Sequence, residues 1–412
     1  LMDPEAGREA RKYFAQRKLS KETIIKFGLG FAPNSQETLL NVLRSRGYKD
    51  NDIIEAGLAV ERNGKVVDKY RNRVIFPIIN VRGKVIGFGG RVMGSNELEN
   101  GIKIPKYLNS PQTPVYDKSS NLFALNLAKD SNERNLILCE GYMDVISVYQ
   151  AGITNCVATL GTALTQQQTK LLLRYGTEIL ICYDMDEAGT KAALRAIDMI
   201  SEAGGKSRVI RITGAKDPDE YISKYGVDGF KTAISKAMPS TAFKLSLIRR
   251  EYDITDTDGK VQFVDAVAKC LITVPDIIEV EAYIKKTAEE TGISERAIFT
   301  KYSQYKSKEP KPRPEKTKEE YKRRELNRIN SEKPKEERVN ATVLDAERRL
   351  LSIIAKSRRL CLKASELLEP SEFSNNIYVT LATRMYDLAR AGDTIDEAII
   401  LNEFSGDVNA EN

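Results

Sequence analysis

The spacing of hydrophobic positions changes along the chain, and each change predicts a different kind of structure. Residues 7–28 and 39–46 carry hydrophobic positions at helical intervals, and Ser20 stands within the first stretch as a helix N-cap. In residues 74–92, two β-branched runs flank a glycine turn, which is typical of a β-hairpin. We therefore expect a mixed α/β unit in the first third of the chain.

Residues 135–225 follow another pattern, in which short apolar runs alternate with helical patterns. The four β-rich runs fall at 135–139, 154–159, 178–183 and 207–212. The helical patterns between them fall at 144–151, 165–175 and 187–203. Strands that are apolar along their whole length and are separated by helices predict an α/β fold, with a parallel, Rossmann-like sheet covered on both faces.

Beyond the sheet, the hydrophobic pattern is helical, except in one stretch of Lys, Glu, Arg and Pro. That stretch is too polar to bury a core, so we interpret it as a solvated linker rather than a nucleic-acid-binding tail. Five segments are predicted in all: 1–130 (α/β), 131–228 (parallel sheet), 229–305 (helical), 306–340 (linker) and 341–412 (helical). The helices of the last segment are expected at 344–355, 363–368 and 378–391.

The composition excludes several kinds of chemistry. The chain contains no histidine, which excludes a histidine general base, a Ser-His-Asp triad and a His-containing zinc site. Its five cysteines form no CxxC pair, and several lie in apolar runs, as expected of core residues in a reducing compartment. No apolar run reaches the ~18–20 residues of a membrane span, so we expect a cytoplasmic protein. The net charge of +6 permits a nucleic-acid partner but does not require one.

Five carboxylates follow strands of the predicted parallel sheet. Glu140 directly follows the first strand, and Asp184 and Asp186 follow the third. Asp217 and Asp219 follow the fourth strand within a short loop. The carboxyl ends of the strands in an open parallel sheet meet at one edge, where ligands bind. We therefore expect the five acids to converge on one crevice.

A carboxylate cluster of this kind is unfavourable without a cation, because like charges at short distance destabilise one another. Oxygen ligands without His or Cys indicate Mg²⁺ or Mn²⁺ rather than zinc, and divalent ions of this type suit phosphoryl or nucleotidyl transfer. Taken singly, an acid after a strand is more often a turn residue or a helix N-cap, and Asp186 and Asp217 fit that alternative. The placement of all five acids on one edge favours the metal site.

Several motifs resemble bacterial DnaG-type primases. Those similar to the Toprim domain are CEGYMDV (139–145), TLGTAL (159–164), CYDMDEAG (182–189) and KDPDEY (216–221). The form EGYMD with a later DPD is characteristic of primases rather than of topoisomerases or recombination-mediator proteins. Those similar to the N-terminal subdomain of the polymerase core are YFAQRKLSKETIIKFGLGFAP (13–33), YRNRVIFPI with GKVIGFGGRV (70–92) and PKYLNSPQTPVYDKS (105–119). The resemblance covers residues 1 to about 305.

The resemblance implies roles for individual residues. Glu140 would be the general base or central metal ligand, with Asp144 in support. The catalytic set would be Glu140, Asp184 and Asp186, and the metal ligands would be Glu140, Asp184, Asp186, Asp217 and Asp219. The family's basic ridge, which holds the template or the incoming nucleotide, matches Arg91, Lys106 and Tyr107. Taken alone, each ridge residue also fits an exposed charge or a packing tyrosine. Gly87, Gly89 and Gly90 fit a hairpin or bulge better than a phosphate loop.

The function implied by the resemblance is that of a primase, which synthesises short RNA primers from ribonucleoside triphosphates on single-stranded DNA with Mg²⁺ or Mn²⁺. Residues 341–412 resemble the start of the family's helicase-binding domain, which implies a replicative DnaB-type helicase as partner. Nothing in the chain matches the family's zinc-binding domain, so zinc is not expected, and both ends look cut. A Toprim nuclease or topoisomerase and a non-catalytic replisome adaptor are the alternatives.

Overall fold

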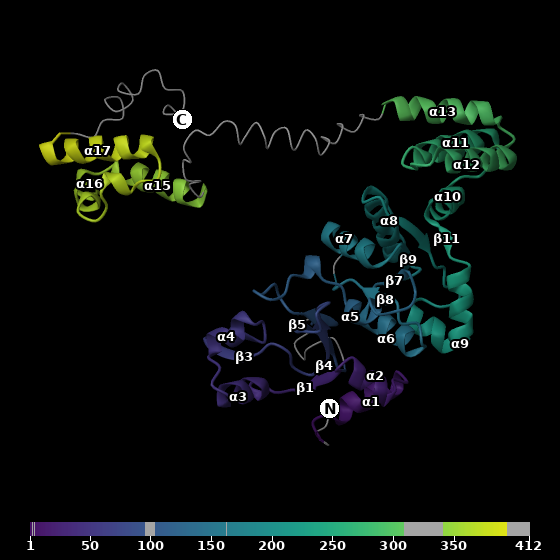
Figure 1. Cartoon of the computed structure of the whole chain (residues 1–412), viewed down its shortest axis with the longest axis horizontal. Helices are drawn as coiled ribbons and strands as arrows, with labels where there is room; N and C mark the ends of the chain where they lie inside the picture. The colour runs from purple at the N-terminus through teal and green to yellow at the C-terminus, as the bar shows by residue number, and fades with distance from the viewer. Residues whose placement is uncertain (2, 4, 95–103, 162, 309–340, 394–412) are drawn as a thin grey trace. The chain divides into compact units, whose positions relative to one another are not determined.

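The computed structural model describes residues 1, 3, 5–94, 104–161, 163–308 and 341–393 (Figure 1). The chain divides into two compact units, Leu1–Glu309 and Pro310–Asn412. The first unit contains the predicted α/β segments and a group of helices, and the described residues of the second are helical or lie in the turns between helices. Over the described ranges, no helix combines the length and the apolar character that a membrane crossing requires.

An antiparallel sheet with the strand order β1-β4-β5-β6 organises the first segment. Strands β4 and β5 form the predicted hairpin. The helical stretch predicted over 7–28 divides in two, because Ser20 caps the second helix by accepting the N–H of Thr23 at 3.1 Å. The elements are α1 (Arg8–Gln16), α2 (Lys21–Lys26), β1 (Gly30–Ala32), α3 (Thr38–Ser45), α4 (Asp50–Glu55), β2 (Ala59–Arg62), β3 (Lys65–Asp68), β4 (Arg73–Ile79), β5 (Val85–Val92), β6 (Tyr107–Asn109), η1 (Lys118–Ser120) and α5 (Leu125–Ala128).

The glycines of the GFGG sequence lie within strand β5 and serve its packing. A Cβ atom on Gly89 would lie 2.7 Å from the ring of Tyr142, and one on Gly90 would lie 2.7 Å from the ring of Tyr70. A Cβ atom on Gly87 would lie 3.2 Å from the side chains of Ser110 and Tyr116. These three glycines therefore belong to a hairpin strand, as expected, rather than to a phosphate-binding loop.

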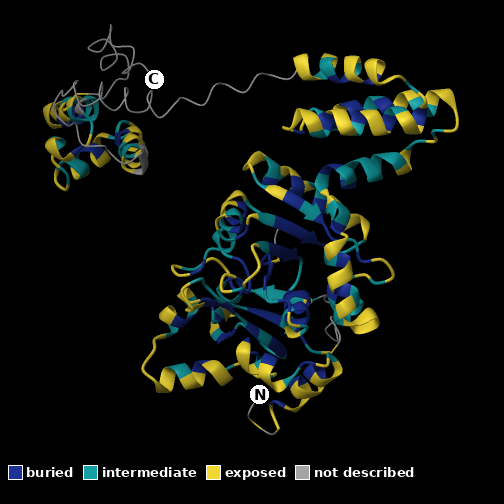
Figure 2. Ribbon diagram, turned by 45° about the vertical axis from the view of Figure 1, so that its right-hand side comes forward, coloured by how far each residue is buried: buried dark blue, intermediate teal, exposed yellow. Residues whose placement is uncertain are grey.

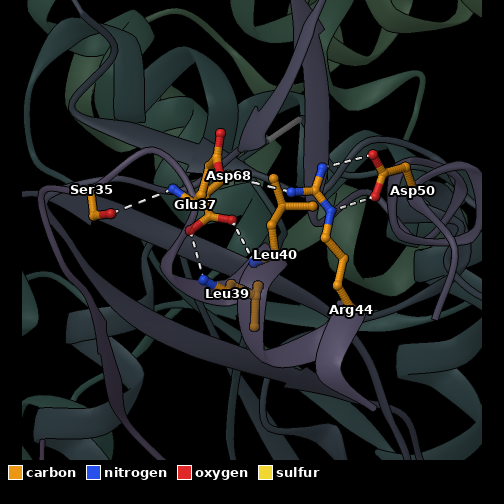
Figure 3. A network of polar contacts seen from close by, with 7 residues as sticks. All are labelled: Ser35, Glu37, Leu39, Leu40, Arg44, Asp50 and Asp68. Carbon is orange, nitrogen blue, oxygen red and sulfur yellow. Dashed lines mark hydrogen bonds and ion pairs between the residues drawn. The ribbon is translucent and has the colours of Figure 1, made fainter. Parts of the chain in front are cut away.

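Helix α3 is capped by a residue that lies far from it in the sequence (Figure 3). The buried carboxylate of Asp68, at the end of β3, accepts the N–H groups of Leu39 at 2.8 Å and Leu40 at 2.9 Å. Arg44, on the same helix, donates two hydrogen bonds of 2.7 Å to Asp50 at the start of α4. These contacts fix α3 against the β2–β3 hairpin and against α4.

The second segment is built on a five-stranded sheet with the order β11-β10-β9-β7-β8. Strands β8, β7, β9 and β10 are parallel, as predicted, and the two-residue β11 pairs with β10 in the antiparallel sense. The elements are β7 (Asn135–Cys139), α6 (Tyr142–Gln150), β8 (Cys156–Ala158), α7 (Gln166–Tyr175), β9 (Glu178–Cys182), α8 (Glu187–Glu202), β10 (Lys206–Val209), α9 (Pro218–Ser235) and β11 (Met238–Pro239).

Alternate residues of β7, an inner strand of the sheet, belong to different cores. Leu136 and Leu138 pack in a cluster with residues of α7 and α8, whereas Ile137 and Cys139 pack in one with residues of α6 and α9. Figure 2 shows buried strands inside the first unit, with the exposed residues mainly on the helices and loops around them. Burial on both faces explains why the strand is continuously apolar. The α6 cluster also contains Phe76 of β4, so the antiparallel sheet and the parallel sheet share one core.

The remaining described residues are mainly helical. The first unit ends with α10 (Ser240–Glu251), α11 (Thr257–Leu271), α12 (Ile277–Thr291) and α13 (Glu295–Lys308). The second contains α15 (Ala341–Ile354), α16 (Arg358–Ser365), η2 (Pro370–Glu372) and α17 (Asn376–Ala391). The expectation of a helix at 363–368 was wrong in its bounds, because α16 begins five residues earlier, after Ser357. Residues 309–340 of the predicted linker and 394–412 lie outside the described residues.

Candidate active site

The acids that follow the two central strands are joined directly. Strands β7 and β9 are neighbours, with Cys139 opposite Cys182, so Glu140 and Asp184 emerge at the same edge of the sheet. One carboxylate oxygen of Glu140, Oε1, accepts the backbone N–H of Asp184 at 3.1 Å. The parallel register therefore brings together two acids that lie 44 positions apart in the sequence.

Three further acids cap the helices that begin at this edge. Asp144 Oδ2 accepts the N–H of Gly141 at 3.1 Å within the first turn of α6. Asp186 caps α8, accepting an N–H at 2.7 Å, and Asp217 caps α9, accepting one at 2.8 Å. The capping alternative is thus confirmed for Asp186 and Asp217. It does not exclude ligand binding, because each of these hydrogen bonds uses one carboxylate oxygen, and three helix N-termini favour negative charge at this edge.

Burial and mutual repulsion raise the pKa values of three acids at the edge. Burial raises the pKa of Glu140, and the charge of Asp186 raises it further, while the N–H of Asp184 opposes both effects. The pKa of Asp184 rises to about 6, first through burial and then through the charges of Glu140, Asp217 and Asp186. Burial, followed by the charges of Asp217 and Asp184, raises the pKa of Asp144 to about 8. Acids from three loops therefore share one electrostatic environment.

The donor set fits a hard divalent cation in its chemistry. All the donors are oxygens, and a bound cation would relieve the repulsion that raises the pKa values of Glu140 and Asp184. Within the described ranges, however, no three His, Cys, Asp or Glu side chains form a group that could hold a metal ion. Mg²⁺ is commonly bound by one or two carboxylates together with substrate phosphates. Glu140 and Asp184 would be enough carboxylates for a site of that kind. The five-ligand set stays a prediction.

The acids border two different hollows. Asp217 and Asp219 line a cavity of about 630 Å³ whose walls come from α1, α6 and α9. Glu140 lines another, of about 380 Å³, together with Tyr183 and residues of α8. The charges of Glu140 and Asp217, which line different hollows, both raise the pKa of Asp184. Asp217 and Asp219 thus line a different hollow from Glu140, and the expectation of one crevice for all five acids stays a prediction.

Asp219 has partners that the sequence did not reveal. Its Oδ1 atom accepts the hydroxyl of Ser147 on α6 at 2.5 Å. Its Oδ2 atom accepts a guanidinium N–H of Arg17, which directly follows α1, at 2.5 Å. Arg17 stands inside the motif of residues 13–33, but nothing local in the sequence indicated that it reaches an acid 202 positions away.

Two of the three residues predicted to form the ridge, Arg91 and Tyr107, lie near this ion pair. Tyr13 is buried, and two guanidinium groups lie over its ring, that of Arg91 at 4.7 Å and that of Arg17 at 5.8 Å from the ring centroid. Arg91 of β5 pairs in register with Tyr107 of β6. Burial, with a contribution from the nearby Tyr13, raises the pKa of Tyr107, whose ring also lies 6.0 Å from that of Tyr142. Tyr107 therefore fits the alternative of a packing tyrosine, and its role in a ridge stays a prediction.

A buried arginine shapes the strand that carries the ridge. The guanidinium of Arg73 donates hydrogen bonds to the carbonyl oxygens of Gly90 at 2.9 Å, Pro105 at 3.0 Å and Lys106 at 3.3 Å. Burial lowers the pKa of Arg73. By joining β5 to the start of β6, this side chain fixes the backbone at Lys106, whose own side chain is exposed.

Tyr142, in the motif after β7, connects the ridge to the acidic edge. Its hydroxyl donates to Asn109 Oδ1 at 2.8 Å, and Asn109 Nδ2 donates to the carbonyl oxygen of Leu160 at 2.7 Å. The Tyr142 ring stacks on Phe76, with a centroid distance of 5.2 Å and an interplanar angle of 8°. Ridge strand β6 is thus fastened to the loop after β8.

Models of known families match three parts of the chain. Residues 1–129 match the DNA primase catalytic core, N-terminal domain, residues 137–222 match a Toprim-like family, and residues 241–296 match the DnaB-helicase binding domain of primase. The last match falls on α10–α12 and the first two residues of α13, whereas helicase contact was predicted through residues 341–412. That prediction stays untested.

Curated relatives are similar over most of the chain. The DNA primase of Clostridium acetobutylicum is 41% identical over 296 residues, which are 72% of this chain and 48% of that protein. The DNA primase of Geobacillus stearothermophilus is 31% identical over 412 residues, covering 99% of this chain and 66% of that protein. The chain spans about half the length of most of the curated relatives it matches.

Solved structures agree with these matches. A structure of the DnaG catalytic core has a TM-score of 0.61 and 32% identity, covering 72% of this chain and 94% of that one. A DnaG primase catalytic domain bound to single-stranded DNA also has a TM-score of 0.61, with 34% identity, covering 72% of this chain and 93% of that one. The shared part corresponds in extent to the first unit.

Proposed function

Since this chain belongs to the DnaG-type primase family, we propose that it acts as a DNA-dependent RNA polymerase that makes short RNA primers on single-stranded DNA. The observation that carries the proposal is the joined pair Glu140 and Asp184 at the carboxyl edge of β7 and β9. Their raised pKa values mark a pair of acids that are partly buried beside other carboxylates, as is common at functional sites.

The reaction would be nucleotidyl transfer. The 3′-hydroxyl of the primer attacks the α-phosphate of a ribonucleoside triphosphate, and pyrophosphate leaves. Glu140 would accept the hydroxyl proton; its half-buried position, its raised pKa and the hydrogen bond from the N–H of Asp184 to its Oε1 atom support this role. A Mg²⁺ or Mn²⁺ ion, held by Glu140, Asp184 and the neighbouring aspartates, would supply stabilisation of the charge that develops on the phosphate oxygens.

The template would lie along the ridge. Lys106 offers an exposed cation to the phosphates, while Arg91 is held by the Tyr13 ring and Tyr107 by its own packing. The link from Tyr142 through Asn109 to the loop after β8 would keep the template at a fixed distance from the acids. Contact with a replicative DnaB-type helicase, through α10–α12 or through residues 341–412, is also proposed.

Primer synthesis on single-stranded DNA with labelled ribonucleotides and Mg²⁺ tests the proposal. Glu140→Gln should reduce the rate by about 10²–10⁴-fold, because the group that accepts the proton is lost while the volume of the side chain is kept. Glu202→Gln, at an exposed position on α8, makes the same charge change away from the site and should leave the rate unchanged.

The products separate primase from the alternatives. Extension products support primase activity, and shortened DNA would indicate a Toprim nuclease instead. Near-normal synthesis by the Glu140→Gln protein would refute the assigned role, and the absence of any metal-dependent synthesis by the unaltered chain would favour the adaptor hypothesis.

A further inference from the structure

We propose that Arg73 is a positioning residue for template binding, which holds the backbone that carries Arg91 and Lys106 so that both side chains reach the DNA phosphates together. The inference rests on the proposed function, because it takes Arg91 and Lys106 as cations that contact the template. It goes further by assigning part of the affinity of the ridge to a buried side chain that touches no DNA.

The guanidinium of Arg73 joins two strands of the antiparallel sheet. On the β5 side, it donates to the carbonyl oxygen of Gly90 at 2.9 Å. On the β6 side, it donates to the carbonyl oxygens of Pro105 at 3.0 Å and Lys106 at 3.3 Å, just before the strand begins. The backbone on either side of the ridge is therefore linked through one side chain.

A buried arginine suits this link in shape and in charge. Arg73 is 5% exposed, and its planar guanidinium presents its N–H donors in fixed directions, whereas a lysine ammonium sits on a flexible stem. Burial lowers the pKa of Arg73, but arginine stays protonated in proteins, so the side chain keeps all of its donors. Its hydrogen bonds to three carbonyl oxygens therefore define the separation of the two strands at this point.

Gly90 leaves room for the arginine. A Cβ atom on Gly90 would lie 3.0 Å from Cδ of Arg73 and 2.7 Å from the ring of Tyr70. A side chain at this position would push the arginine stem away from the carbonyl groups that it holds. Arg91, the next residue, pairs in register with Tyr107. A displaced Arg73 would thus disturb the backbone on both sides of the ridge.

The expected effect on binding is entropic. The side chain of Lys106 is exposed, so it would keep its charge and its access to solvent without Arg73. On a less restrained backbone, however, Lys106 would lose more conformational freedom when it meets a phosphate at the same time as Arg91. The buried residue and the exposed one should therefore be coupled in template binding.

Binding of a short fluorescein-labelled single-stranded DNA, measured by fluorescence anisotropy at several salt concentrations, tests this coupling. In the unaltered chain, Lys106→Ala should weaken binding about three- to tenfold and reduce the slope of log K against log salt concentration by about 0.7, as for one phosphate contact on a single strand. In an Arg73→Lys background, Lys106→Ala should change the affinity less than about twofold, because Lys106 is no longer held where it meets the phosphate.

Asn72→Gly is the matched control. The side chain of Asn72 donates to the carbonyl oxygen of Met93 at 3.1 Å, so the substitution removes a neighbouring link to the end of β5 and leaves the contacts of Arg73 in place. Glycine readily adopts the φ of 50° found at this position. In this background, Lys106→Ala should have the same effect as in the unaltered chain.

Additive effects of Arg73→Lys and Lys106→Ala would overturn the positioning role. Gly90→Ala disturbs the same contact from β5, so it should also weaken the effect of Lys106→Ala, and it serves as the second background if Arg73→Lys does not fold. Additivity there would equally overturn the inference. If Lys106→Ala left binding unchanged in the unaltered chain, the ridge itself would fail, and the positioning role with it.

Primer synthesis by the Arg73→Lys protein adds an independent measurement. The KM for template should rise by a larger factor than kcat falls, because the acids at the edge of the parallel sheet are unaltered. A fall in kcat with an unchanged KM would contradict a role in holding the template. Absence of synthesis by the unaltered chain would refute the proposed function, whereas the binding measurements would still decide the role of Arg73.

Discussion

Replacing Asp144 with Asn should make the protein less sensitive to alkaline pH. Asp144 is 9% exposed, and burial together with neighbouring acids raises its pKa from 3.8 to about 8. Asn has nearly the same shape, and its amide oxygen is able to accept the Gly141 N–H that Asp144 Oδ2 accepts at 3.1 Å. The substitution therefore removes the titration and keeps the cap.

The direction follows from the raised pKa. Between the unfolded pKa near 4 and the folded pKa near 8, the folded protein keeps a proton on Asp144 that the unfolded chain releases, so stability falls as pH rises through this window. From pH 5 to pH 9 the loss amounts to about 3–5 kcal/mol in the metal-free protein. For a unit of this size, that is roughly 6–10 °C in apparent Tm.

Thermal unfolding of both proteins in a metal-free buffer at pH 5, 7 and 9 measures this difference. The two Tm curves should meet near pH 5 and diverge as pH rises, with Asp144→Asn the more stable. Asp228→Asn, a substitution at an exposed position on α9, is the control, and its Tm should equal that of the unaltered protein at every pH. Parallel curves for Asp144→Asn and the unaltered chain would refute the assignment of a protonated, buried Asp144.

Two further substitutions test contacts within the first segment of the chain. Asp68→Ala should destabilise α3 by about 2–4 kcal/mol, because the N–H groups of Leu39 and Leu40 lose their acceptor. Hydrogen exchange at these two amides should become much faster. Unchanged protection of the amides would contradict the capping role of Asp68. Gly89→Ala should lower the free energy of unfolding by about 1–3 kcal/mol, because the new Cβ atom would lie 2.7 Å from the Tyr142 ring. Urea unfolding measures this change, and an unchanged midpoint would show that the ring moves freely.

The sequence by itself determined the elements and much of the local chemistry. The alternation of apolar runs and helical patterns predicted strands β7 to β10, and strand β7 matches its predicted range residue for residue. The capping roles of Ser20, Asp186 and Asp217 were also visible, because a cap depends on residues three positions away. The placement of Glu140 and Asp184 at one edge followed from the rule for parallel strands.

Only the tertiary structure decided which of the acids have partners. The pairing of Asp219 with Arg17 joins residues 202 positions apart, and the hollow lined by Asp217 and Asp219 depends on how α1, α6 and α9 pack. Periodicity reports whether a position faces a core, but it carries no information on which distant side chain arrives beside it. That choice is made when two faces become complementary in shape and charge, which is a property of the folded chain rather than of any segment.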